Sequence, residues 1–217
     1  MKILSQIKYS LMDKVINQIE SGLKILTDQY GSTLRANPAK NIEEAALSEK
    51  ERKHVAGLMR VNHIGEICAQ ALYQGQALTA RSKLIKQKMQ HCAQEEIDHL
   101  AWCRDRLNEL NTHTSYLNPL WYVGSFTLGI VAGLAGDQWN LGFVEETENQ
   151  VVKHLNSHFE KLPKADKKSL AILEQMHKDE SLHAKTAKQC GAAELPFIIK
   201  QFMRVSAKMM TTTGYYL

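Results

Sequence analysis

Two Glu-x-x-His sequences, Glu96-Ile97-Asp98-His99 and Glu180-Ser181-Leu182-His183, constrain this chain of 217 residues more than any other feature. Both lie where apolar residues recur every three or four positions, which predicts helices. Residues three apart on a helix lie on the same side, about one turn apart, so each sequence directs a carboxylate and an imidazole toward one point. Each sequence is therefore half of a predicted metal site.

Apolar stripes place both pairs on the buried faces of their helices. Glu96 and His99 fall within the first stripe, and Glu180 and His183 fall within the second. The two stripes consist of Met89, Cys92, Leu100, Cys103, Leu107 and Leu110, and of Leu173, Met176, His177, Ala184 and Ala187. A buried carboxylate without a partner costs free energy or takes up a proton, so something must compensate these two acids.

Two further acids are expected to face the same interior. Glu148 is centred in an apolar stripe, whereas its neighbours Glu145 and Glu146 lie at the edge of that stripe or outside it. Glu66 lies on a stretch that is apolar over a wide arc. Each of these acids precedes a Glu-x-x-His sequence by about thirty positions, which predicts two helical hairpins. The pattern favours Glu148 over Glu145 as the third-helix ligand.

Four inward carboxylates carry a charge that two divalent cations would neutralise. Carboxylate oxygens mixed with imidazole nitrogens suit iron or manganese. This is the ligand arrangement of ferritin-like di-iron and di-manganese carboxylate bundles. The sequence therefore predicts one dinuclear site with the metal ligands Glu66, Glu96, His99, Glu148, Glu180 and His183.

Two other function classes share part of this pattern. A metal-free helical interaction module would pair the inward acids with Arg or Lys, and no basic residue lies in the ligand stripes. A ferritin-type ferroxidase or iron store uses the same ligands but needs a polar, cage-forming exterior. The uncharged stretch 117–135 and the amphipathic tail after Pro196 argue against that alternative.

The rest of the sequence predicts an all-α, ferritin-like four-helix bundle, because Gly and Pro are sparse and strand-type alternation is nearly absent. The core helices are expected at 48–80, 82–111, 137–162 and 164–190. Ser48 and Glu51 fit a capping box at the start of the first. Residues 48–217 are predicted to form the ferritin-like domain, and residues 1–47 an N-terminal amphipathic helix and a connector.

Three additional helices, N-terminal, middle and C-terminal, are expected to be amphipathic or apolar. The N-terminal segment mixes lysines with Ile, Leu and Val and lacks the continuous apolar core of a secretion signal. Packing on the bundle is favoured there over lying on a membrane. Residues 117–135 carry no charge, and they predict either a helix covering the bundle or a surface that enters one membrane leaflet. The tail after Pro196 is compatible with both environments.

Composition excludes several functions. The net charge of +4 comes without a basic block, so nucleic-acid binding is not expected, although a mildly basic surface would suit an anionic membrane. The four cysteines lack Cys-x-x-Cys spacing and are expected to be reduced core residues. No flavin or dinucleotide motif occurs, so electrons for redox chemistry must come from outside the chain.

Four segments carry a family resemblance: 60–66 (RVNHIGE), 95–100 (EEIDHL), 118–126 (NPLWYVGSF) and 179–184 (DESLHA). From about Ser48 onward they resemble the demethoxyubiquinone hydroxylases of ubiquinone biosynthesis. The resemblance implies a di-iron monooxygenase that hydroxylates a ring carbon of a polyprenylated methoxy-methyl benzoquinol, demethoxyubiquinol, with dioxygen as co-substrate. It implies two iron ions per chain, with Glu96 and Glu180 bridging them and the other four ligands terminal.

The resemblance also implies an external electron donor, either a reductase or the quinol itself. It implies peripheral attachment to the cytoplasmic face of a bacterial inner membrane, and association with other ubiquinone-biosynthesis proteins. From the repeat of the motif, we expect Glu95 and Asp179 each to accept a hydrogen bond from the imidazole of the other repeat. Asp98 is expected to lie well off its apolar stripe, and His63 is expected at the surface.

Overall fold

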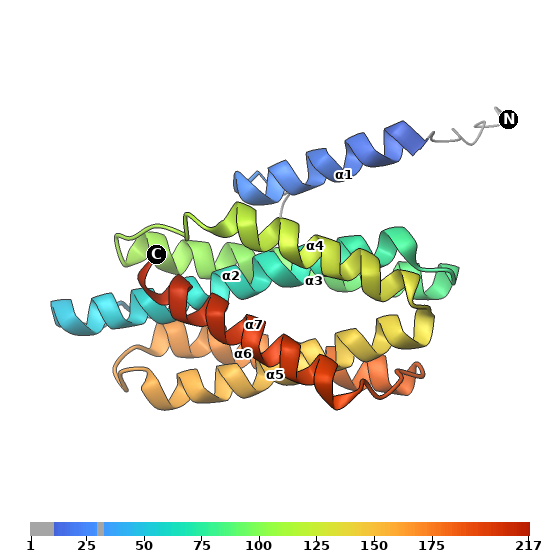
Figure 1. Ribbon diagram of the computed structural model, residues 1–217. Coiled ribbons are helices and arrows are strands. Elements are labelled where there is room, and N and C mark those ends of the chain that lie inside the picture. Colours follow the sequence, from blue (N-terminus) through green and yellow to red (C-terminus); the bar gives the residue numbers. More distant parts are fainter. Residues whose placement is uncertain (1–10, 30–32) are drawn as a thin grey trace, which may run out of the picture. The chain divides into compact units, whose positions relative to one another are not determined.

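The computed structural model describes residues 11–29 and 33–217, and every regular element among them is a helix (Figure 1). The all-α prediction is therefore confirmed. The chain divides into two compact units, Met1–Gly31 and Ser32–Leu217. The first contains the amphipathic helix α1 (Leu11–Leu26). The first ten residues of the predicted N-terminal helix lie outside the described residues.

Four long helices form the bundle of the second unit: α2 (Glu49–Thr79), α3 (Lys83–Glu109), α5 (Asp137–Lys161) and α6 (Lys167–Gln189). α2 packs against α3, and α5 packs against α6, which gives the two predicted hairpins. The predicted capping box is confirmed, because the Ser48 hydroxyl accepts from the Glu51 amide while the Glu51 carboxylate accepts from the Ser48 amide.

Two further helices cover the bundle, α4 (Asn118–Leu134) and α7 (Phe197–Tyr216). α4 packs along α2, and α7 packs mainly on α2 (Figure 1). Gly75 and Gly129 allow the first contact, because a Cβ at either position would collide with a backbone carbonyl of the facing helix. None of the described helices is both long enough and apolar enough to cross a membrane.

The apolar core has two clusters, and the predicted ligands lie between them. Along α2, one cluster includes Val55 and Met59 while the other begins at Ala69, and Glu66 lies between them. The same order holds on α3, α5 and α6, where each predicted ligand is flanked by a cluster residue on either side. The core thus fixes the predicted ligands at mid-height in the bundle.

The stretch predicted as a connector is tied to the bundle through the buried side chain of Arg106. Its guanidinium contacts Glu44 at 2.6 Å (Nη1 to Oε2) and Asp166 at 3.0 Å (Nη2 to Oδ1). Asp166 also caps α6, since its carboxylate accepts from the Ser169 amide. Residues 33–47 therefore have a defined path along the bundle.

The prediction that His63 lies at the surface is wrong, because this residue is only 1% exposed. Asp98 lies outside the ligand cluster, as its place off the stripe predicted, but it too is only 1% exposed. α3, α4 and α7 all pack against α2, so the face that carries His63 is covered as well. Asp98 is covered by the connector, since its carboxylate accepts hydrogen bonds from the Leu34 amide and from Arg35. The spacing of apolar residues along one helix does not show which other segments pack over its remaining faces.

Candidate metal centre

The structure brings all six predicted ligands together in the bundle interior. Their donor atoms form two overlapping groups, each within 4.8 Å: Glu66, Glu96, His99 and Glu180, and Glu96, Glu148, Glu180 and His183. We call these the His99 half and the His183 half. All six residues are buried. Glu96 and Glu180 belong to both halves, which is the position that bridging ligands require.

Each imidazole directs one nitrogen into the cluster and the other outward. His99 Nδ1 lies 2.9 Å from Glu96 Oε2 and 3.1 Å from Glu180 Oε1. His183 Nδ1 lies 3.2 Å from Glu180 Oε2. Nδ1 is therefore the candidate ligand atom on both rings, and Nε2 is free to bond elsewhere.

The Nε2 atoms cross between the repeats as predicted. His99 Nε2 lies 2.9 Å from Asp179 Oδ2 on α6, and His183 Nε2 lies 2.9 Å from Glu95 Oε2 on α3. Each carboxylate thus fixes the outward nitrogen as the N–H donor and leaves Nδ1 for a metal. The predicted geometry of Glu95 and Asp179 is confirmed.

Glu148, rather than Glu145, is the third-helix acid of the cluster. Glu148 is 1% exposed, and Tyr73 of α2 donates its hydroxyl hydrogen to Oε1 of this residue. Glu145 is part-exposed, and its Oε1 lies 3.5 Å from Lys188 Nζ on the outside of the bundle. The prediction of Glu148 over Glu145, made from the apolar stripe, is therefore confirmed as to which side chain faces the cluster.

The electrostatics of the cluster favour binding of cations. Burial raises the pKa of Glu66 well above its usual range, and the charge of Glu96 raises it further. Burial raises the pKa of Glu148 in the same way. Burial alone would lower the pKa of His99, but Glu96 and three hydrogen-bonded carboxylates outweigh it and raise that pKa well above its usual range. Metal ions would replace the protons that these groups retain.

Unsatisfied oxygens provide a test of whether a metal fits this cluster. Oε1 of Glu96 and Oε2 of Glu148 are buried, and they accept no hydrogen bond from any residue that the structure describes. Buried polar atoms without partners are rare in folded proteins. Two divalent cations would supply partners for these oxygens and match the mixed oxygen and nitrogen donors of iron sites. The residues present therefore fit a dinuclear metal centre.

Sequence reasoning missed Arg35, which lies just outside the cluster. Its Nε donates to Asp98 at 2.8 Å, and its Nη1 donates to Asp179 at 2.6 Å. Nη2 lies 3.5 Å from His99 Nε2. Arg35 belongs to a polar stretch without helical periodicity, so no pattern in the sequence linked it to the site.

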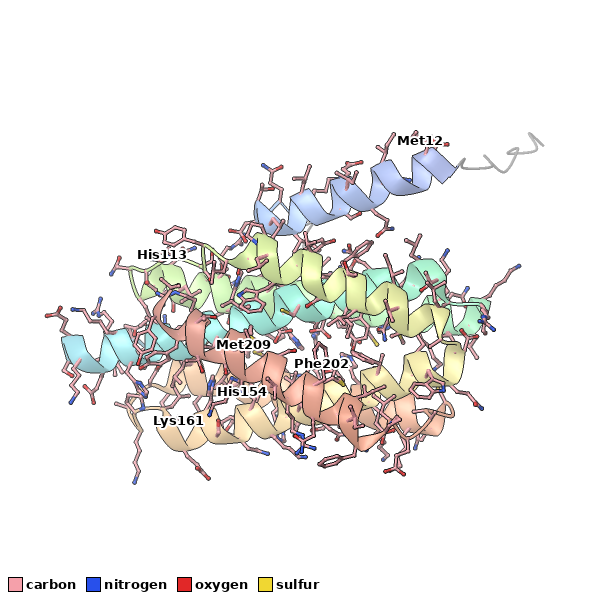
Figure 2. The ribbon with its side chains drawn as sticks, viewed as in Figure 1. Met12, His113, His154, Lys161, Phe202 and Met209 are labelled. Carbon is pink, nitrogen blue, oxygen red and sulfur yellow. The ribbon has the colours of Figure 1, made fainter. Side chains whose placement is uncertain are left out.

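A cavity of about 590 Å³ reaches the cluster from the outside of the bundle. Side chains of α2, α4, α5 and α7 line it, and most of them are apolar. Representative lining residues are Asn62, Glu66, Leu72, Leu128, Phe143 and Phe202. Phe202 and Met209 lie along α7, and His154 of α5 belongs to the same lining as Phe202 (Figure 2). Because Glu66 contributes to both, the cavity meets the His99 half.

The chain matches known proteins over almost its whole length. Residues 53–214 match the family described as "Ubiquinone biosynthesis protein COQ7". A 3-demethoxyubiquinol 3-hydroxylase of Legionella pneumophila (strain Corby) is 54% identical over 209 residues, which are 96% of this chain and 98% of the relative. Proteins of the same name from Nitrosococcus oceani and Acinetobacter baumannii (strain SDF) are each 52% identical, over 210 and 209 residues. These alignments cover 97% and 96% of this chain, and 98% and 99% of the relatives.

The similarity and the geometry agree. The matched range contains all six residues of the cluster, all of α3, α5 and α6, and all but the first turn of α2. The alignments exceed 50% identity and cover nearly the full length of both chains. The chain therefore belongs to the COQ7 family of ubiquinone biosynthesis proteins.

Proposed function

We propose that this chain is a 3-demethoxyubiquinol 3-hydroxylase, which adds one oxygen atom from dioxygen to a ring carbon of a polyprenylated benzoquinol. The observation that carries the proposal is the cavity whose lining includes Glu66 of the buried Glu and His cluster. The relatives' name supports the same reaction. Neither observation supports the ferroxidase or iron-storage alternative.

Two iron ions per chain are part of this proposal. Glu96 and Glu180 would contact both ions, while Glu66 and His99 would hold one and Glu148 and His183 the other. Reduced iron with open positions activates dioxygen, which is the chemistry that side chains do not supply. The bundle shields the cluster, whose six residues are each at most 5% exposed.

The cavity is suited to a quinol ring with an apolar tail. The tail would lie against lining residues of α4 and α7, such as Leu128 and Phe202. Asn62 would orient the ring, because it lines the cavity, is 3% exposed and has an Oδ1 that accepts no hydrogen bond from the described residues. That oxygen can accept a hydrogen bond from a quinol hydroxyl.

We propose that electrons are supplied from outside the chain, because its sequence carries no flavin or dinucleotide-binding motif. The quinol itself can provide two electrons, and a separate reductase is the other source. Association with other ubiquinone-biosynthesis proteins stays a prediction from the family resemblance.

The membrane face of the protein is proposed to be the side where α4 and α7 border the cavity. Both helices expose apolar side chains at helical spacing: Leu120, Val123, Val131 and Leu134 on α4, and Ile198, Phe202, Val205 and Met209 on α7. Arg204 and Lys208 line the cavity between these helices and would pair with anionic headgroups. Such a surface would let a prenylated substrate pass from a membrane leaflet into the cavity.

The direct test is oxygen incorporation. Iron-loaded chain is mixed with demethoxyubiquinol carrying a short prenyl tail under ¹⁸O₂, and the iron-free chain serves as the control. We expect a product that contains one ¹⁸O atom and forms only with iron. Iron uptake without any oxygenated product would contradict the proposed function.

The cavity is tested by filling it. Ser125→Trp places a large side chain in the lining, whereas Thr127→Trp places the same side chain on the exposed face of the same helix. We expect Ser125→Trp to raise KM or abolish turnover while iron content is unchanged, and Thr127→Trp to retain activity. Equal activities for the two variants would remove the cavity from the proposal.

Membrane attachment is tested with vesicles that contain an anionic phospholipid. We expect the wild-type chain to sediment with them, and Phe202→Glu combined with Met209→Glu to stay in the supernatant. Lys161→Glu with Lys178→Glu is a charge control at exposed positions of α5 and α6 that do not line the cavity. Binding that survives the α7 substitutions would place the membrane contact elsewhere.

A further inference from the structure

The two halves of the metal cluster have similar ligands but different surroundings. In the His99 half, the outward imidazole nitrogen meets Asp179, and Asp179 in turn meets Arg35. In the His183 half, the matching carboxylate is Glu95, whose other contact is His91 at 3.0 Å. The side chain of His91 is 74% exposed, against 33% for Arg35. Among the residues that the structure describes, a fixed cation therefore supports the His99 half and not the His183 half.

Three contacts hold the guanidinium of Arg35 in place. Its edge donates to Asp98 of α3 and to Asp179 of α6, so one side chain joins the two helices that carry the Glu-x-x-His sequences. Its face lies over Trp102, with Cζ at 5.0 Å from the ring centroid. Trp102 also neighbours the ring of His99 at 5.4 Å between centroids. A planar, forked cation can make these contacts together, whereas the point charge of a lysine cannot.

Arg35 affects the orientation of the His99 ring through Asp179. Asp179 can serve as the acceptor for His99 Nε2 only if its carboxylate keeps its direction, and that carboxylate is 14% exposed. Arg35 binds the same oxygen, Oδ2, that accepts from His99. The arginine thus fixes the acceptor, the acceptor fixes the ring, and the ring directs Nδ1 toward Glu96 and Glu180.

We propose that Arg35 is a positioning residue that makes the two metal positions unequal. It holds Asp179 against His99, whereas the outer contact of Glu95 among the described residues is an exposed histidine. This proposal rests on the proposed metal centre. It assigns a role in the site to the connector between α1 and α2, which lies outside all four ligand helices.

The experiment is a titration of the metal-free chain with Co²⁺ alone, followed by its absorption spectrum, because Co²⁺ accepts the same oxygen and nitrogen donors. We expect the wild-type chain to bind two equivalents. Arg35→Met should weaken one equivalent by up to about 10-fold and leave the other within about twofold, because Asp179, the direct partner of His99, remains and a direct partner is itself worth about 10–100-fold. Arg35→Lys, which keeps the charge but not the fork, should fall between these two proteins.

Two control variants distinguish the loss of the Arg35 contacts from a general destabilisation of the fold. Glu44→Ala removes the contact of the same connector with Arg106 and leaves Arg35 in place. His91→Met removes the corresponding outer contact of the other half. Both variants are expected to bind two equivalents with affinities within about twofold of wild type. The melting temperature of each metal-free variant reports whether the fold is retained.

Three results would overturn the proposal while the metal centre stands. These are wild-type affinities in Arg35→Met, an equal loss for both equivalents, or the same loss in Glu44→Ala as in Arg35→Met. A wild-type chain that takes up no Co²⁺ would instead overturn the metal centre, and the role of Arg35 with it.

Discussion

Tyr73 donates its hydroxyl hydrogen to Glu148, and this buried contact joins α2 to α5 at the level of the cluster. Tyr73 is fully buried, so its hydroxyl needs a partner inside the bundle. The contact fixes one oxygen of Glu148 and leaves Oε2 without a hydrogen-bond partner among the described residues. This arrangement distinguishes Glu148 from the other acids of the same helix.

Glu148→Ala should therefore abolish metal binding at one position, whereas Glu145→Ala should not. We expect the iron content of Glu148→Ala to fall from two to about one or fewer per chain, and turnover to fall more than about 100-fold, since even outer partners of metal ligands are worth about 10–100-fold. Iron analysis and steady-state assays measure both effects. The result that would count against this assignment is normal iron content in Glu148→Ala with loss in Glu145→Ala.

Asp179→Asn and Glu95→Gln should each weaken metal binding without removing a ligand. The amides keep the size of the side chains but lose the charge that orients the imidazole N–H, so we expect a 10–100-fold lower metal affinity for each. Glu174→Gln, an exposed position on α6, is the matched control and should change nothing. Unchanged affinity in both Asp179→Asn and Glu95→Gln would show that the cross-repeat contacts do not tune the site.

Stability should fall with acidification because of two histidines that are not part of the cluster. Burial lowers the pKa of His158 to about 2 and that of His154 to about 4, and their rings lie 4.0 Å apart. Below the unfolded-state pKa of about 6.5, the unfolded chain takes up protons that the folded chain refuses. Each residue thus contributes stability that is present above pH 6.5 and is lost as the pH falls, at up to about 1.4 kcal/mol per pH unit.

The measurement is the free energy of unfolding of the metal-free chain between pH 7 and pH 5. His158→Gln should show a shallower dependence on pH than wild type, whatever its absolute stability. His113→Gln, which replaces an exposed histidine, should keep the wild-type slope. A wild-type slope in His158→Gln would mean that this imidazole does not resist protonation in the folded chain.

Gly129→Ala should separate α4 from α2. The added Cβ would meet the carbonyl oxygen of Leu72, and a backbone atom cannot move aside as a flexible side chain can. We expect a loss of stability of at least about 1–3 kcal/mol, the usual cost of overpacking. Gly124→Ala on the same helix meets nothing within 4 Å and should stabilise the chain by up to about 1 kcal/mol. Denaturant unfolding compares the two, and similar stabilities would contradict the close packing.

Much of the fold and of the cluster could be predicted from the sequence, because both depend on helical periodicity. The stripes around Glu96, Glu148 and Glu180 identified the inward acids, and the repeat of the motif identified the cross-repeat roles of Glu95 and Asp179. These are properties of single helices or of the symmetry between two hairpins. Neither requires knowledge of how distant segments pack.

The features that could not be predicted depend on such packing. Arg35 lies 63 positions from Asp98 and 144 from Asp179, in a stretch without periodicity. His63 was expected at the surface, yet it is buried because helices cover α2 on several faces. The cavity likewise combines α4 and α7 with the bundle, and the sequence left the environment of both helices open.

The most direct test of the account is the location of iron in a crystal of the iron-loaded chain, by anomalous diffraction at the iron absorption edge. The account predicts two peaks inside the bundle, one contacted by Glu66 and His99, the other by Glu148 and His183, and both by Glu96 and Glu180. Anomalous peaks that lie elsewhere in the protein, with none at this cluster, would contradict the account.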